Sequence, residues 1–224
     1  MPDTSPADGY ALWAVLRRDP ARPAAAGASA AELDDLLSRL GEQGVTTRGV
    51  YDVSGLRADA DLMFWLHGTD PAALQAAVRR IRRTALVAPL APRWSALGVH
   101  RDAEFNRSHV PGFLRGERAR EWLAVYPFVR SLDWYVLPDA DRMRMLAEHG
   151  RKGAAYKSVV ANTVAAFALG DYEWILPMES DVLVDLVDMM RDLRATEARL
   201  HVREEVPFFT GRRIEVTEVQ EVLS

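Results

Sequence analysis

The spacing of apolar residues predicts a strand followed by a helix near the start of the chain. Residues 9–18, GYALWAVLRR, are rich in aromatic and branched apolar side chains, which are typical of a β-strand. Ser29 and Glu32 have the spacing of a capping box, in which Glu32 would accept a hydrogen bond from the cap amide. We therefore expect a helix over about 29–43, ended by Gly44. Its apolar face consists of leucines at helical spacing, Leu33, Leu36, Leu37 and Leu40.

Two strands, a helix and a closing strand complete the first half. Segments 45–54 and 61–67 are predicted strands, separated by the turn-like SGLRADAD. Asp70 and Pro71 form a helix-start signal, because Pro is favoured in the first helical turn. The predicted helix has one apolar face, made by Leu74, Ala77, Val78 and Ile81. The segment RWSALGVHR then has the pattern of a strand.

The second half repeats this order of elements. The predicted elements are a strand at 121–130, a helix at 139–149, strands at 159–169 and 171–178, a helix at 180–201 and a strand at 206–213. The segments MFWLHGTDPAALQAAV and YEWILPMESDVLVDLV both run from an aromatic strand through a turn into an amphipathic helix. A β-α-β-β-α-β unit used twice is the ferredoxin-like plan.

We therefore predict an α+β fold of two tandem ferredoxin-like units, a dimeric α+β barrel within one chain. The expected division is an N-terminal unit at 9–100, a connecting loop at 101–120 and a C-terminal unit at 121–224 that carries the ligand site. Each such sheet has helices on one face only, so its other apolar face needs cover. The pocket could lie between a sheet and its helices or between the two sheets.

Composition narrows the possible functions. The 224 residues are 49% hydrophobic with a net charge of −4, so the chain has material for a core but no basic footprint for nucleic acid. The absence of cysteine excludes disulfides, thiolate nucleophiles, iron–sulfur clusters and Cys-bound zinc. The N-terminal segment has neither a basic n-region nor a long apolar run. No signal peptide or membrane span is expected, and a cytoplasmic location is the simplest interpretation.

Candidate chemistry gathers in residues 104–150. Tyr126 and Arg130 lie four residues apart in the strand WLAVYPFVR, so alternation puts both side chains on one face. A tyrosine in such a strand is usually part of the core. An arginine beside it is less usual and suggests an anionic ligand, most naturally a carboxylate.

Two histidines complete the candidate set. His149 shares a helix face with Met145 and Leu146 and precedes Gly150. The structural interpretation is a histidine favoured by the dipole at a helix C-terminus, and the functional one is an imidazole presented to haem iron. His109 lies in a polar loop that contains Pro111 and Gly112, where histidines are commonly just solvated.

Several segments together resemble the coproheme decarboxylases of the chlorite dismutase-like superfamily, specifically their actinobacterial group. The resemblance runs from about Tyr10 to Arg213 and is carried by EFNRSHVPGFLRGERAREWLAVYPFVRSLDWY, MLAEHG, ANTVAAFALGDYEW and RATEARLHVREEVPFFTGRR. It implies two ferredoxin-like units per subunit and a homopentameric ring. It also implies iron-coproporphyrin III as both substrate and redox cofactor, with transient contact to the iron-inserting chelatase as a further expectation.

The resemblance implies a role for each candidate residue. Tyr126 matches the catalytic phenol, His149 the proximal iron ligand and His109 the distal base. The expected substrate-binding residues are Arg130, the weaker candidate Arg199, and two tryptophans that line or neighbour the pocket, Trp134 and Trp174. The implied reaction uses hydrogen peroxide and a tyrosyl radical to convert two propionates to vinyl groups, through a three-propionate intermediate, giving haem b.

Position 162 bears on the choice between related activities. Chlorite-dismutating relatives carry a distal arginine thirteen residues after the proximal histidine, where this chain has Asn162. Chlorite chemistry is therefore disfavoured, and the distal polar role passes to His109. Two alternatives remain on the same fold, namely a haem peroxidase and a haem-binding carrier or sensor.

Overall fold

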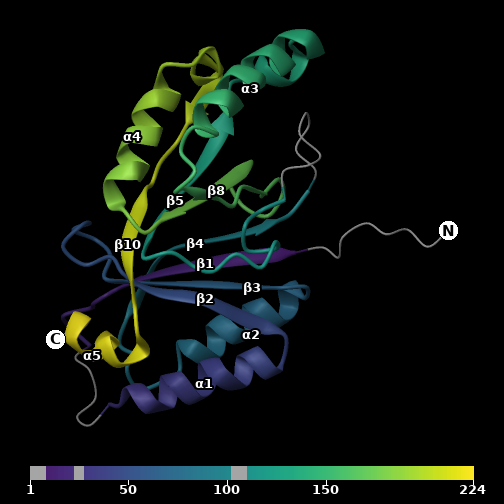
Figure 1. Cartoon of the computed structure of the whole chain (residues 1–224). Helices are drawn as coiled ribbons and strands as arrows, with labels where there is room; N and C mark the ends of the chain where they lie inside the picture. The colour runs from purple at the N-terminus through teal and green to yellow at the C-terminus, as the bar shows by residue number, and fades with distance from the viewer. Residues whose placement is uncertain (1–8, 23–27, 102–109) are drawn as a thin grey trace. The chain divides into compact units, whose positions relative to one another are not determined.

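A computed structural model describes residues 9–22, 28–101 and 110–224. It divides the chain into two compact units (Figure 1). The first contains residues 1–100 and 211–224, and the second contains residues 101–210. The predicted site residues that the structure describes lie in the second unit.

The first unit is a ferredoxin-like sheet with two helices. Its strands lie in the order β4-β1-β3-β2, and each neighbouring pair is antiparallel. Helices α1 and α2 cover one face of this sheet (Figure 1). The elements are β1 (Tyr10–Arg17), α1 (Ala30–Glu42), β2 (Val45–Asp52), β3 (Leu62–Gly68), α2 (Pro71–Ile81) and β4 (Ala91–Val99).

The helix caps of this unit follow the sequence signals with one correction. Ser29 accepts a hydrogen bond from the Ala31 amide, and Gly44 adopts a φ of +82° just after α1. The predicted capping box is wrong, however. The Glu32 carboxylate accepts the Ala85 amide at 2.8 Å, so it ties α1 to the segment after α2.

The second unit has the same topology. Strand β9 pairs with β5, β5 pairs with β8, and the short strands β6 and β7 both pair with the other edge of β8. All these pairs are antiparallel. The elements are β5 (Trp122–Arg130), η1 (Trp134–Val136), α3 (Asp139–Gly153), β6 (Val160–Ala161), β7 (Val164–Ala165), β8 (Trp174–Ser180), α4 (Leu183–Arg194), η2 (Glu197–His201) and β9 (Val202–Glu204).

Several predicted boundaries in this unit are wrong. The single strand expected at 159–169 is two strands of two residues each, β6 and β7. The helix expected at 180–201 ends at Arg194, because the buried Thr196 hydroxyl donates to the Leu193 carbonyl and satisfies a group that a longer helix would use. Helix α3 continues through Gly150 to Gly153, so Gly150 is not its C-cap.

The C-terminal segment belongs to the first unit, in contrast to the expected C-terminal domain at 121–224. Strand β10 (Phe209–Ile214) pairs with β2, with Ile214 opposite Val50. The short helices η3 (Val216–Glu218) and α5 (Val219–Val222) follow it. Ile214 and Val219 are buried in the core of the first unit, and this burial holds residues 211–224 there.

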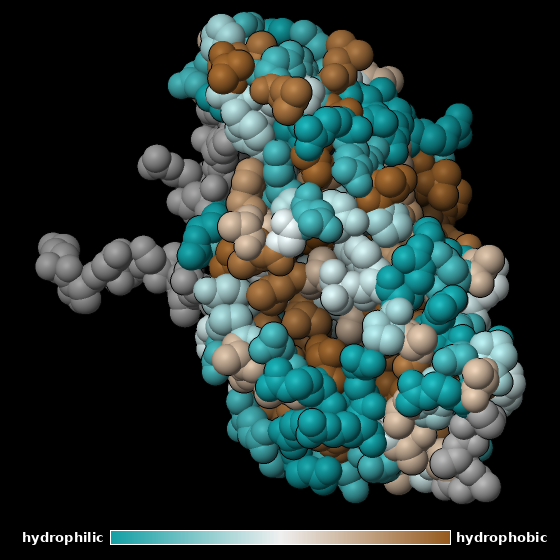
Figure 2. Space-filling model, turned by 180° about the vertical axis from the view of Figure 1, so that it is seen from behind, coloured by the Kyte–Doolittle hydropathy of each residue, from teal (hydrophilic) through white to brown (hydrophobic). Residues whose placement is uncertain are grey.

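The surface carries apolar as well as polar side chains. Figure 2 shows hydrophobic residues in brown among hydrophilic ones in teal on the face that it presents. Leu132, Val136 and Leu200 are strongly exposed, all three in the second unit. Among the described residues, no helix is both long and apolar enough to span a bilayer.

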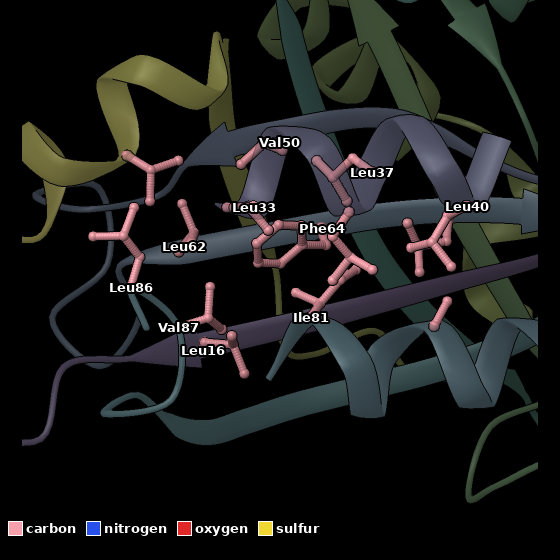
Figure 3. Close-up of a cluster of buried hydrophobic side chains, with 14 of the residues drawn as sticks. Leu16, Leu33, Leu37, Leu40, Val50, Leu62, Phe64, Ile81, Leu86 and Val87 are labelled. Atoms are coloured by element: carbon pink, nitrogen blue, oxygen red, sulfur yellow. The ribbon is translucent and has the colours of Figure 1, made fainter. Parts of the chain in front are cut away.

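Each unit has a core between its sheet and its helices. In the first unit, Leu33 and Leu37 of α1 and Ile81 of α2 pack with Leu62 and Phe64 of β3 (Figure 3). Burying each such side chain stabilises the fold by roughly 1.5–3 kcal/mol. In the second unit, the corresponding layer brings β5 and β8 against α4, with Ala124, Tyr126, Met178, Leu186, Met189 and Leu193 buried together. This layer is not filled, because it also contains a cavity.

Candidate functional site

The cavity of the second unit has about 710 Å³ of empty space, its open mouth included. Its walls come from β5, β8, α3, α4 and the segment from η2 to residue 205. Four of the predicted site residues line it together, Tyr126, Arg130, His149 and Arg199.

Tyr126 lies on the sheet wall and is only 3% exposed. Its ring stacks on Phe208 with 4.2 Å between centroids, and its hydroxyl donates a hydrogen bond to the Met190 sulfur at 3.5 Å. Burial raises the pKa of Tyr126, and the negative charge of Glu205 raises it further. The side chain is therefore a neutral phenol at physiological pH, and a thioether holds its hydroxyl only weakly. A phenol in this state can give up a hydrogen atom, that is, a proton together with an electron.

Arg130 follows on the same face of β5, as alternation predicts. Its guanidinium carbon lies 4.1 Å from the ring centroid of Trp134 and 4.9 Å from that of Phe128. Its backbone amide donates to the Glu173 carboxylate at 2.8 Å. Two aromatic contacts and an anchored backbone hold this cation at the cavity wall, where it can receive a carboxylate.

His149 reaches the cavity from α3. Burial lowers the pKa of His149, and the positive charge of Arg130 lowers it further, whereas Glu148 acts in the opposite direction. The imidazole is therefore neutral at pH 7 and keeps a lone pair for a metal ion. Its Nδ1 is buried and has no hydrogen-bond partner in the described part of the chain. A neutral imidazole at the wall of a largely apolar cavity can bind the metal of an apolar cofactor.

The two predicted tryptophans are neighbours of the cavity and not among its lining residues. Trp134 is almost fully buried with Met145 and Ala198, beneath the Arg130 guanidinium. Trp174 lies on β8 opposite Phe128, and the two rings stack with 6.3 Å between centroids. Trp134 therefore affects the cavity through Arg130, and Trp174 affects it through Phe128.

Residue 162 does not face the cavity. Ala161 and Thr163 on either side of it line the cavity, while Asn162 is fully buried and bonded elsewhere. Its Oδ1 accepts the Phe113 amide at 2.9 Å, and its Nδ2 donates to the Glu179 carboxylate at 3.1 Å. It therefore anchors the segment after Val110 to the sheet. His109, the predicted distal base, lies outside the described residues.

Several residues that line the cavity were not predicted from the sequence. Arg194 and Glu205 form an ion pair at the cavity wall, and Met189 and Met190 contribute sulfur-containing side chains from α4. The amphipathic pattern of α4 identifies an apolar face but not which part of that face lines an opening. Arg194 ends α4 and Glu205 follows β9, and no short motif links them.

Comparison with known proteins gives consistent results. A family model described as chlorite dismutase matches residues 26–214. The chain is 55% identical over 186 residues to a coproheme decarboxylase from Mycolicibacterium smegmatis, with 83% of this chain and 80% of that protein covered. It is 26% identical over 188 residues to a coproheme decarboxylase from Thermus thermophilus, with 79% of this chain and 75% of that protein covered.

The fold has close counterparts among solved structures. A chlorite dismutase from Candidatus Nitrospira defluvii in complex with imidazole aligns with a TM-score of 0.83 and 21% sequence identity. The alignment covers 96% of this chain and 95% of that one. The predicted fold class, α+β with tandem ferredoxin-like units, is thereby confirmed.

Proposed function

Because the chain belongs to the chlorite dismutase family, and within it is 55% identical to a coproheme decarboxylase, we propose that it is a coproheme decarboxylase. The observation that carries the proposal is the meeting of Tyr126, Arg130 and His149 in one cavity. The proposed reaction is the hydrogen-peroxide-dependent conversion of two propionates of iron-coproporphyrin III to vinyl groups. It proceeds through a three-propionate intermediate and yields haem b.

The atoms and electrons of this reaction balance. Each propionate loses CO2 and, overall, one hydrogen atom and one electron to become a vinyl group. One hydrogen peroxide takes up these two electrons and, with protons, becomes two molecules of water. Iron-coproporphyrin III supplies the redox chemistry when it is bound.

The cavity has the groups that an iron porphyrin with four carboxylates needs. His149, a neutral imidazole whose pKa burial lowers, would hold the iron. Leu176, Met178 and Leu193 would provide apolar contact to the macrocycle. Arg130 would hold a propionate, since its guanidinium is fixed over Trp134.

The residues of the chain would position and deprotonate the reacting groups. Tyr126 would give up the hydrogen atom of its hydroxyl and take one from a propionate, and its hydroxyl is bonded only to the Met190 sulfur among described residues. His109 would accept a proton from peroxide as a general base. Trp134 and Trp174 would act through Arg130 and Phe128, which they contact, and Arg199 would receive a second carboxylate.

Two other activities are compatible with the same fold. A haem peroxidase would oxidise external reductants and would not need Arg130 beside Tyr126. A haem-binding carrier or sensor would need His149 alone. The pairing of a buried phenol with a carboxylate-binding cation favours the decarboxylase.

We also expect the chain to assemble into a ring of five subunits and to act in the cytoplasm, with transient contact to the iron-inserting chelatase. The exposed Leu132, Val136 and Leu200 support an interface with a second copy, because large exposed apolar side chains in a group often mark protein contacts. The Ser131 amide donates to the His201 carbonyl at 3.0 Å, which brings Leu132 and Leu200 close together.

The test is to add iron-coproporphyrin III to the purified protein, titrate hydrogen peroxide and follow the porphyrins by mass spectrometry. We expect two successive losses of one CO2 and two hydrogen atoms. Tyr126→Phe should bind the porphyrin but yield no product. Tyr156→Phe is the matched control, because Tyr156 bonds Asp192 and does not line the cavity. Bleaching of the porphyrin without decarboxylated product would refute the proposal and favour a peroxidase.

A further inference from the structure

More positively than negatively charged side chains line the cavity. Three arginines line it, Arg130, Arg194 and Arg199, and Glu205 is the one carboxylate among its described lining residues. Since a porphyrin with four propionates carries up to four negative charges, the net positive wall suits it. Glu205 carries the same charge as such a ligand and lies among the groups that would bind it.

Glu205 is bonded to two of these arginines through the same oxygen. Its Oε2 forms an ion pair with Arg194 Nη1 and lies 3.4 Å from Arg199 Nη2. The Glu205 side chain is 15% exposed, and those of Arg194 and Arg199 are each 37% exposed. The pair is therefore partly shielded from solvent, and it forms between the end of α4, η2 and the residue after β9.

We propose that Glu205 occupies the place of a ligand carboxylate and must be displaced when a propionate binds to Arg194 and Arg199. This inference rests on the function proposed above. A propionate can present both of its oxygens to the two guanidinium groups, whereas Glu205 uses one oxygen for both. A ligand without a carboxylate at this position cannot displace Glu205.

Displacement makes Glu205 a specificity-determining residue. The internal carboxylate competes with every anionic ligand, so only one with carboxylates placed for these arginines gains from binding there. A vinyl group that replaces a propionate at this position no longer competes, and the ion pair with Glu205 can form again. The exchange therefore weakens the binding of a product that has lost this carboxylate.

The simpler interpretation is that Glu205 only holds the two arginines in position. The two interpretations predict opposite effects of Glu205→Gln on affinity. Loss of a competing charge strengthens binding of a carboxylate ligand, whereas loss of a support weakens it. Glu204→Gln is the matched control, because Glu204 is the exposed neighbouring carboxylate and does not line the cavity.

The experiment measures the dissociation constant of iron-coproporphyrin III, and of its tetramethyl ester, whose four side chains are uncharged, by quenching of tryptophan fluorescence without peroxide. For Glu205→Gln we expect about fivefold tighter binding of the tetracarboxylate, as removal of a partly exposed ion pair implies. We expect no change for the ester, no change with Glu204→Gln, and a smaller gain at high salt. Glu205→Asp, whose shorter side chain cannot bridge both arginines equally, should show an intermediate gain.

Equal or weaker binding of the tetracarboxylate by both Glu205 variants, with tight binding by the unaltered protein, would overturn the inference and leave the proposed function standing. Equal gains for the tetracarboxylate and the ester would overturn it as well, because the effect would then not depend on carboxylates. Failure of the unaltered protein to bind iron-coproporphyrin III would instead overturn the proposed function and, with it, this inference.

Discussion

Replacement of Asn162 by leucine should destabilise the second unit while leaving the cavity able to bind its ligand. Asn162 is fully buried between β6 and β7 and makes side-chain hydrogen bonds in both directions. Its Oδ1 accepts the Phe113 amide at 2.9 Å, and its Nδ2 lies 3.1 Å from the Glu179 carboxylate. Leucine has the same number of side-chain heavy atoms as asparagine, but its methyl groups are larger than the amide and replace neither interaction.

The expected magnitude follows from these two bonds. A hydrogen bond to a charged group contributes about 1.5–3 kcal/mol to stability, and one between neutral groups contributes about 0.5–1.5 kcal/mol. Leucine leaves no empty space at this site, and any strain from its larger methyl groups acts in the same, destabilising direction. We therefore expect the free energy of unfolding to fall by about 2–4 kcal/mol.

The assay is urea denaturation followed by tryptophan fluorescence and far-ultraviolet circular dichroism, with a porphyrin titration on the folded protein. Asn162→Asp is an informative companion, since it keeps an oxygen for the Phe113 amide but sets a second carboxylate beside Glu179. Repulsion between the two carboxylates raises the pKa of the pair. The added destabilisation should therefore be greatest at neutral pH and should shrink as pH falls and one carboxyl takes up a proton.

Two results would refute this reasoning. A loss below about 0.5 kcal/mol, within the range of ordinary surface substitutions, would mean that Asn162 does not anchor the segment that contains Phe113. Unchanged stability with loss of porphyrin binding would mean that the side chain faces the cavity.

Three further predictions concern stability. Gly112→Ala should destabilise the protein by about 1–3 kcal/mol in the same assay, because an added Cβ would collide with Cγ1 of Val160, and a wild-type midpoint would contradict this. Burial, with a smaller contribution from Arg48, lowers the pKa of His67 from 6.5 to about 4. The unfolded chain therefore binds a proton at His67 more readily than the folded chain does. The stability that neutral His67 contributes is complete above about pH 6.5 and is lost as the pH falls towards 4. This loss is at most about 3 kcal/mol, and His67→Gln should remove it from a pH series of denaturation curves; parallel curves for the two proteins would show that His67 is not responsible. Leu33→Ala should cost about 2–5 kcal/mol by thermal denaturation, since Leu33 is fully buried, and a change under 1 kcal/mol would mean that the core closes around the gap.

Much of the fold could be predicted because the local signals and the buried faces agree. The cap at Asp70 and the proline after it mark the start of α2 in the sequence and in the structure. The leucines at helical spacing on α1 are the residues that pack on β3. The repeated order of elements identified both ferredoxin-like units. Each unit uses the same β-α-β-β-α-β order to pack its two helices on one face of its sheet.

The errors arose where a side chain makes a distant or unexpected contact. Glu32 has the spacing of a capping box but bonds the Ala85 amide, a partner that only the folded chain brings near. Thr196 interrupts a favourable helical pattern by bonding the Leu193 carbonyl. The expected C-terminal unit runs to residue 224, whereas Val219 packs in the core of the first unit, whose other residues are distant in the sequence.

In the candidate site too, residues of one strand could be assigned from the sequence, whereas contacts between different elements could not. Tyr126 and Arg130 could be assigned to one wall from alternation along a single strand, and the structure has both on that wall. Arg194 and Glu205 could not be paired, because Arg194 ends α4 whereas Glu205 follows β9, and the two meet only after folding. Sequence motifs therefore identified Tyr126 and Arg130, which we propose act on the ligand, but not Glu205, which we propose competes with it.

Residue 162 shows why spacing along the chain is a weak guide at the end of a short strand. Counting thirteen residues from His149 identifies Asn162, but successive side chains of an extended segment point to opposite faces. Ala161 and Thr163 take the cavity face, so Asn162 is directed to the other side and bonds Glu179. A shift of the strand register by one residue would exchange these two faces. The hydrogen bond from Asn162 to Glu179 opposes such a shift, because a buried carboxylate that loses its hydrogen bonds destabilises the fold. The polar side chain that this segment presents to the cavity is therefore Thr163, and the side chain of Asn162 serves to hold the segment in place.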